Sequence, residues 1–341
     1  MFDLTTLIRP NIAALQPYSS ARDEFSGKAE IYLDANENPF GQWNRYPDPT
    51  QFSLKKKLSE VKKIPMENIF IGNGSDEIID LLLRVFCEPK KDKILTFMPT
   101  YGMYSVCAAL NDVTLLEVAL DENFQIDEKR LNSILSDENL KAIFLCSPNN
   151  PTGNTLDRID KILENFNGIV VVDEAYIDFS DSESLLAKLE KYPNLVILQT
   201  LSKAWGLAAA RIGIGFASAE IVQVLDRVKP PYNVSQLNQD AAISALDDVA
   251  TFENRLKTLI VQRFWLISEL EKLQIVKKVY PTQANFVLAE FTDADLVYEN
   301  LLADGIIVRN RNSVVKNCLR ISVGTPTENQ LLIAKLQQLK P

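Results

Sequence analysis

Lys203 is the central candidate for a catalytic residue in this sequence, because other reactive side chains stand before and after it at the ends of apolar runs. A run of apolar residues precedes it by a few positions, and Asp173 and Asn150 each follow an earlier apolar run. Arg211 comes shortly after the lysine. If these runs are neighbouring strands of one sheet, an amine, a carboxylate, an amide and a guanidinium collect where the strands end. That set of groups suits one cofactor, pyridoxal 5′-phosphate (PLP).

Each of these groups has a chemical reason to be there. A lysine that is desolvated and close to a positive charge, here Lys203 near Arg211, loses its proton readily and can form a Schiff base. A carboxylate at Asp173, beside the pyridine nitrogen, keeps that nitrogen protonated and makes the ring a better electron sink. Asn150 and Tyr176 can hydrogen-bond the phenolic oxygen of the ring.

The cofactor phosphate needs hydrogen-bond donors, and the sequence offers a turn for it. Gly72–Ser75 follows an apolar run and opens a helical pattern, so free backbone N–H groups are expected there. The dinucleotide pattern G-x-G-x-x-G does not occur at this turn. The side chains and turn residues expected around the phosphate are Gly74, Ser75, Asp76, Thr200, Ser202 and Arg211.

Other side chains extend the predicted site toward a substrate. Tyr101 could stack on the pyridine ring. Arg320 and Arg309 each stand in or beside an apolar strand-like run, where a guanidinium favours a bidentate anion. Plainer interpretations exist: a core aromatic for Tyr101, structural ion pairs for the two arginines, a helix cap for Asp173 and simple packing for Tyr176.

Composition narrows the chemistry further. The chain of 341 residues contains no histidine, which excludes Ser-His-Asp catalysis, histidine-ligated zinc and imidazole bases. A net charge of −9 argues against a nucleic-acid partner. We expect no signal peptide, no membrane segment and no metal, and four widely spaced cysteines indicate reduced thiols. A cytoplasmic protein is the expectation.

The pattern of apolar runs and helical segments predicts an α/β fold. Runs that are apolar throughout and separated by helices are typical of a mostly parallel sheet with both faces covered. The predicted helices are Asp76–Cys87, Tyr101–Leu110, Asp127–Leu135 and Leu156–Asn165. The seven predicted strands are Ile69–Ile71, Lys93–Phe97, Thr114–Val118, Ala142–Cys146, Ile169–Val172, Leu195–Thr200 and Ile212–Ala217.

A second, smaller unit is expected after this sheet. A long helical stretch, interrupted in places, is predicted over Gln236–Lys272, followed by short strands and helices of α+β type. The predicted strands of this unit are Val276–Tyr280, Asn285–Ala289 and Leu319–Val323. We predict an irregular N-terminal arm at 1–40 that packs on the small domain or on a neighbouring subunit, a large PLP-binding domain at 41–262 and a small C-terminal domain at 263–341.

These motifs resemble those of a known family. Asn149–Gly153, Asp173–Tyr176 and Ser202-Lys203 with Arg211 are similar to the fold-type I PLP-dependent aminotransferases. Within that group the chain resembles the histidinol-phosphate aminotransferases, and the resemblance covers nearly the whole chain. The segments that carry this second likeness are Leu33–Pro39, Arg45–Asp48, Asn73–Glu77, Pro99–Tyr101 and Leu319–Thr325.

The resemblance implies a reaction and an assembly. It implies transfer of the amino group of L-histidinol phosphate to 2-oxoglutarate, giving imidazole-acetol phosphate and L-glutamate in histidine biosynthesis. It also implies a homodimer in which Tyr46 reaches the cofactor phosphate of the other subunit, with Tyr18 and Asn36 on the substrate side. The alternatives are an aromatic aminotransferase or phosphothreonine decarboxylase on the same scaffold, or a PLP-binding regulator without turnover.

Overall fold

The computed structural model describes residues 2–16 and 31–340. Its larger unit is built on one seven-stranded sheet. Its strands are β1 (Ile69–Asn73), β2 (Lys93–Met98), β3 (Thr114–Ala119), β4 (Leu140–Cys146), β5 (Ile169–Asp173), β6 (Leu195–Thr200) and β7 (Ile212–Phe216). They lie in the order β1-β7-β6-β5-β4-β2-β3. The pairs from β6 to β3 are parallel, whereas β7 is antiparallel to both β6 and β1. The predicted α/β fold with a mostly parallel sheet is confirmed.

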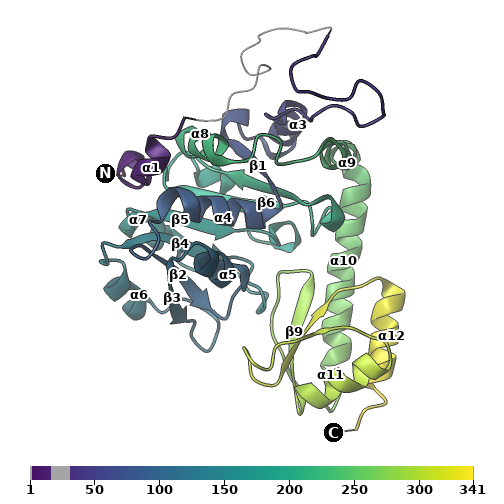
Figure 1. Ribbon diagram of the computed structural model, residues 1–341. Coiled ribbons are helices and arrows are strands. Elements are labelled where there is room, and N and C mark those ends of the chain that lie inside the picture. Colours follow the sequence, from purple (N-terminus) through teal and green to yellow (C-terminus); the bar gives the residue numbers. More distant parts are fainter. Residues whose placement is uncertain (1, 17–30, 341) are drawn as a thin grey trace.

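Helices cover both faces of this sheet (Figure 1). One layer contains α4 (Ser75–Phe86), α5 (Met103–Leu110) and α8 (Ala219–Val228). The other contains α3 (Phe52–Lys62), α6 (Glu128–Ile134), α7 (Ile159–Asn165) and α9 (Gln236–Asp247). Successive strand residues point to opposite faces, so Phe70 packs in the first layer while Ile69 and Ile71 pack in the second. Most of these strands are apolar because both of their faces are buried, whereas the edge strand β3 is partly exposed.

The smaller unit is a four-stranded antiparallel sheet with helices on one side. Its elements are α10 (Val249–Leu270), β8 (Val276–Val279), β9 (Phe286–Phe291), α11 (Ala294–Ala303), β10 (Arg309–Asn310), β11 (Cys318–Ser322) and α12 (Pro326–Leu336). The strand order is β10-β11-β9-β8. Short 3-10 helices elsewhere in the described chain are Leu4–Thr6, Met66–Asn68, Ile177–Phe179, Leu185–Lys188 and Ala208–Ala210.

One continuous helix, α10, connects the two units (Figure 1). Near its start Phe252 packs against the large core and stacks on Trp205 with ring centroids 3.8 Å apart. Near its end Leu266 and Leu270 belong to the core of the small unit. The long helical stretch predicted here breaks between α9 and α10 at Asp248, whose side chain accepts a hydrogen bond from the N–H of Thr251 and caps α10.

Among the described residues before α3, those at 2–16 and 31–51 have short or no regular structure. Residues 2–16, predicted to be irregular, contain a 3-10 turn and the one-turn helix α1 (Pro10–Ala13). Within the described residues, no helix is long and apolar enough to cross a membrane. All four cysteines are buried and free, as predicted.

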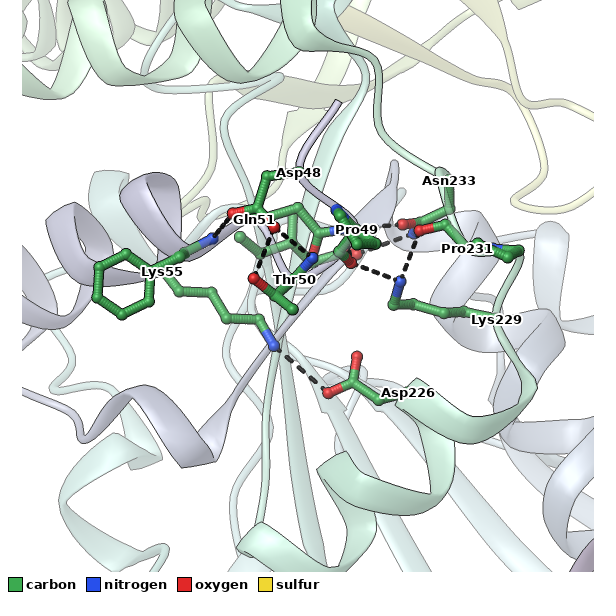
Figure 2. Close-up of polar contacts among 11 residues, drawn as sticks. Asp48, Pro49, Thr50, Gln51, Lys55, Asp226, Lys229, Pro231 and Asn233 are labelled. Carbon is green, nitrogen blue, oxygen red and sulfur yellow. Dashed lines mark hydrogen bonds and ion pairs between the residues drawn. The ribbon is translucent and has the colours of Figure 1, made fainter. Parts of the chain in front are cut away.

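A buried polar network attaches the chain before α3 to the large domain (Figure 2). The Gln51 side chain donates to the carbonyl of Pro49 and to Asn233 Oδ1, both at 3.0 Å. Lys229 Nζ donates to the same Pro49 carbonyl at 2.8 Å. Gln51 has a left-handed backbone, with φ at 49°. The network therefore fixes the segment that carries Tyr46.

Candidate active site

A cavity of about 560 Å³ lies at the carboxyl ends of the large-domain strands, with the small domain completing its wall. Twelve of the predicted site residues line it. From the large domain these are Ser75, Asp76, Tyr101, Asn150, Asp173, Tyr176, Thr200, Ser202, Lys203 and Arg211, and from the small domain Arg309 and Arg320. Gly74 adjoins the cavity through its contact with the Arg211 guanidinium.

Lys203 lies in the turn that follows β6, with its side chain open to the cavity. Burial by the surrounding protein is the largest cause that lowers its pKa, followed by the positive charge of Arg320. Asp173 acts in the opposite direction. The amine nitrogen is 5.7 Å from the ring centroid of Tyr176. A lowered pKa makes the neutral, nucleophilic form of the lysine more accessible.

Asp173 is the last residue of β5 and is 4% exposed. Its Oδ2 accepts a hydrogen bond of 2.9 Å from the Tyr104 hydroxyl, and its Oδ1 accepts one of 3.0 Å from the N–H of Ala175. Burial raises the pKa of Asp173 to about 6, and these two hydrogen bonds oppose the rise. The bond to Ala175 is a local turn contact, so the carboxylate also stabilises the backbone that follows it.

Asn150 joins the two domains at the cavity wall. Its amide Nδ2 donates to the Tyr176 hydroxyl at 3.4 Å, and its Oδ1 accepts a short hydrogen bond from Arg320 of β11. Burial also raises the pKa of Tyr176, so the phenol keeps its proton. The structure thus brings together an amide, a phenol and a guanidinium that are far apart in the sequence.

The turn from β1 into α4 has the shape of an anion-binding loop. Gly74 has φ at 81°, in the region that favours glycine, and Ser75 begins α4 with its N–H groups free of helix partners. Arg211 lies against the turn, and its Nη2 is 3.6 Å from Asp76 Oδ2. Ser202 Oγ is buried without a hydrogen-bond partner among the described residues. An anion in this turn would give that hydroxyl a partner.

Tyr101 lines the cavity just before α5, and Tyr104 lies behind it in the first turn of that helix. The Tyr101 hydroxyl donates to Asp76 Oδ1 at 3.0 Å, and its ring meets Tyr104 edge-on at 5.6 Å. Tyr104 is fully buried and was not predicted as a site residue. Its position three residues after Tyr101, one helical turn further on, is a signal that could have suggested it.

Two further residues that the sequence reasoning missed contribute to the site. Gly213 of β7 has no room for a Cβ, which would overlap the backbone of Gly74 and the N–H of Ser75. Arg311 of the small domain lines the cavity together with Arg309 and Arg320. Among the described residues, no carboxylate forms an ion pair with Arg309 or Arg320, so the structural ion pair considered for them is not observed.

Tyr46 and Asn36 lie away from this cavity. Both line a separate hollow of about 390 Å³. The Tyr46 ring stacks on Tyr232 with centroids 4.5 Å apart. Apolar side chains around them are exposed, among them Leu33 at 89% and Phe40 at 82%. Tyr18, predicted on the substrate side, lies outside the described residues.

Comparison with known proteins agrees with this arrangement. The family model for aminotransferases of class I and II matches residues 23–336. A histidinol-phosphate aminotransferase from Bacteroides thetaiotaomicron is 53% identical over 99% of both chains. One from Parabacteroides distasonis is 52% identical over the full length of both.

Solved structures show the same fold. The histidinol-phosphate aminotransferase from Clostridium acetobutylicum superposes with a TM-score of 0.80 at 26% identity, covering 87% of this chain and 90% of that one. The enzyme of that name from Sinorhizobium meliloti, solved with pyridoxal 5′-phosphate, has a TM-score of 0.78 at 24% identity over 96% of both chains. The chain belongs to the class I and II aminotransferase family, on the branch whose curated members are named histidinol-phosphate aminotransferases.

Proposed function

We propose that this protein transfers the amino group of L-histidinol phosphate to 2-oxoglutarate, using PLP held by Lys203. The observation that carries the proposal is the composition of the cavity. Its large-domain wall supplies an amine, a buried carboxylate and an anion-binding turn, and its small-domain wall supplies guanidinium groups. The names of the curated relatives at 53% and 52% identity support the choice of substrate.

The residues present fit PLP at three separate points. The turn at Gly74 and the Ser202 hydroxyl, which has no hydrogen-bond partner in the described part of the chain, suit its phosphate. The Asp173 carboxyl, which is costly to bury alone, suits the pyridine nitrogen. Lys203 suits the aldehyde, because burial lowers its pKa. When bound, PLP supplies an electron sink for the bonding electrons of the substrate carbon.

Each of the protein's own groups in the site has a distinct role in the proposed reaction. Lys203 would hold the cofactor through its Nζ, and the same amine, when free, would take the proton from the substrate carbon and deliver it to the carbon that was the cofactor's aldehyde. Asp173, whose Oδ2 accepts from the Tyr104 hydroxyl, would as a carboxylate keep the pyridine nitrogen protonated. Asn150 and Tyr176 hydrogen-bond the phenolic oxygen. The turn at Gly74 and the Arg211 guanidinium hold the phosphate in place.

The small-domain arginines bind the anionic ends of both substrates. Arg320 is well placed because its Nη1 reaches Asn150 across the domain boundary while its Nε is buried without a partner among the described residues. A guanidinium forms two parallel hydrogen bonds with a carboxylate or with a phosphate, so the same arginine can serve histidinol phosphate and glutamate. We propose Arg309 and Tyr18 for the substrate side as well, and Asn36, which lines the separate hollow with Tyr46, for that side only in an assembled dimer.

We further propose that the active form is a homodimer. The exposed apolar side chains around Tyr46 form the kind of surface that marks an interface. In such a dimer Tyr46 of one subunit would donate to the cofactor phosphate of the other. We also propose the arm at 1–40, the large domain at 41–262 and the small domain at 263–341 as the units of the chain. The four free thiols support a reducing, cytoplasmic setting.

A comparison of substrates tests the proposal. The purified protein with PLP is assayed with histidinol phosphate, phenylalanine and phosphothreonine, with 2-oxoglutarate as the acceptor. We expect the highest kcat/KM for histidinol phosphate. A higher value for phenylalanine would replace the proposal with an aromatic aminotransferase, and carbon dioxide released from phosphothreonine would replace it with a decarboxylase. No turnover of any of the three would favour a PLP-binding regulator.

A further inference from the structure

Three guanidinium groups, and not two, face the cavity from the small domain. Arg309 of β10 pairs directly with Arg320 of β11, and directly opposed residues of an antiparallel pair point to the same face. Arg311 is two residues beyond Arg309, so the alternation of side chains returns it to that face. Its N–H donates to the Cys318 carbonyl at 2.9 Å, which continues the pairing by one step. All three arginines line the cavity.

Their charges are not neutralised by the described protein. No carboxylate in the described residues forms an ion pair with Arg309, Arg311 or Arg320. The two carboxylates that line the cavity, Asp76 and Asp173, belong to the large domain, where they contact Arg211 and Tyr104. Like charges on opposed strand positions destabilise a sheet. An anionic ligand is what would offset this repulsion.

Unlike Arg320, which donates to Asn150, Arg311 makes no side-chain hydrogen bond among the described residues. Its Nε is buried without a hydrogen-bond partner among the described residues. Burial is the largest cause that lowers its pKa, followed by the charges of Arg320 and Arg309. A guanidinium nonetheless remains protonated in proteins, so it keeps a donor that needs an acceptor.

Hydrogen bonds on both sides of Arg311 order the loop that carries it. The Arg311 carbonyl accepts from the N–H groups of Val314 and Val315, both at 2.8 Å. On either side of Arg311, Asn310 and Asn312 donate to the two oxygens of Asp295, at 2.6 and 2.7 Å. Because the loop is already ordered, binding an anion there requires little further ordering.

We propose that Arg311 is the residue that makes this site prefer a phosphate ester to a carboxylate. The inference rests on the proposed function and adds a residue to it. A phosphate ester has three terminal oxygens and nearly two negative charges at pH 7, whereas a carboxylate has two oxygens and one charge. Arg320 and Arg309 satisfy a carboxylate. The third guanidinium finds an acceptor when the ligand is a phosphate.

Equilibrium binding to the PLP-loaded protein tests this without turnover. The probes are n-propyl phosphate and glutarate, neither of which has an amine to react. The variants are Arg311→Met and, as a matched control, Lys316→Met, which removes an exposed positive charge from the same hairpin outside the cavity lining. Titration calorimetry should show n-propyl phosphate weakened about ten- to a hundredfold by Arg311→Met, as expected for a lost charge-assisted hydrogen bond. Glutarate should change less than about threefold, and the control should leave both affinities within about twofold.

The remaining outcomes are also decisive. If Arg311→Met weakened the binding of both probes equally, Arg311 would contribute only general positive charge. If the affinity for n-propyl phosphate did not change, Arg311 would not take part in binding. Either result overturns the proposal. Arg311→Lys, which keeps the charge but not the forked geometry, should recover only part of the lost affinity and covers the case in which the Met variant fails to fold. If the wild-type protein fails to transaminate histidinol phosphate, the proposed function falls, while the two probes still decide the role of Arg311.

Discussion

Replacing Asp173 with asparagine should stabilise the cofactor-free protein at neutral pH. The carboxyl is 4% exposed, and burial raises its pKa to about 6, against about 4 in an unfolded chain. Between these values the native state keeps a proton that the unfolded state has released, so the free energy of unfolding falls as the pH rises through this window. Roughly two pKa units at about 1.4 kcal/mol each give a loss of about 2–3 kcal/mol by pH 7.5. Asparagine has no charge to bury and avoids that loss.

Urea denaturation of both proteins at pH 4 and pH 7.5 measures this effect. The cofactor is removed and the protein concentration is held fixed, because ligand and assembly both shift apparent stability. The free energy of unfolding of Asp173→Asn, relative to wild type, should rise by about 2–3 kcal/mol between the two pH values. Other carboxylates titrate alike in both proteins and cancel in this comparison. A relative stability that does not change with pH would refute the reasoning.

The same substitution should act in the opposite direction on catalysis. Without a carboxylate to keep the pyridine nitrogen protonated, the electron sink is weaker, and we expect transamination to slow by several orders of magnitude. Stopped-flow measurement of the first half-reaction reports this rate. A variant within about tenfold of the wild-type rate would show that Asp173 acts as a structural carboxylate only.

Four other predictions follow from the same contacts. Borohydride should trap the cofactor on Lys203 alone, and peptide mapping that finds it on another lysine would contradict the assignment. Tyr104→Phe removes a hydrogen bond to ionised Asp173 and should raise the pKa of that carboxyl by about one to two units. The acidic limb of the kcat/KM profile should then move to higher pH, whereas an unchanged profile would leave Tyr104 a packing role. Gly213→Ala should weaken PLP binding at least about tenfold in a fluorescence titration, because a methyl group there overlaps the phosphate turn, and unchanged affinity would mean that the turn can move. Mixing inactive Lys203→Ala and Tyr46→Ala subunits should restore up to about a quarter of wild-type activity through hybrid dimers with one intact site, and no recovery would argue against shared sites.

Much of the site could be predicted because its residues interrupt apolar strands. Asp173 ends a strand whose residues are all buried, and Lys203 closes a turn just after another. A charged group at such a place differs clearly from its apolar neighbours in the sequence. Because the carboxyl ends of parallel strands meet at one edge of the sheet, these groups could be expected to lie together. The central strands β4 to β7 were predictable because both of their faces are buried, so their sequences are almost entirely apolar.

The parts that were missed depend on contacts that no local pattern carries. Tyr104 reads as a core aromatic on α5, and its hydrogen-bond partner Asp173 is far away in the sequence. Arg311 follows a strand of only two residues, β10, which is too short to show a period. The antiparallel direction of β7 likewise depends on how the chain turns between Thr200 and Ile212 and not on the composition of the strand.

Because α10 runs without a break from the large unit into the small one, a bend in this helix would move the small domain as a whole. At 1.5 Å of rise per residue, its 22 residues extend about 33 Å, from a foot packed in the large core to a tip in the small one. A bend of about 5° at the foot would displace the tip by about 3 Å, which is more than the roughly 1 Å within which a substrate group must be held. The stiffness of this helix therefore limits how far the small-domain arginines can shift relative to the large-domain wall of the cavity. A substitution that makes α10 more flexible at its midpoint, far from the residues of the site, would weaken substrate binding without changing the groups that react.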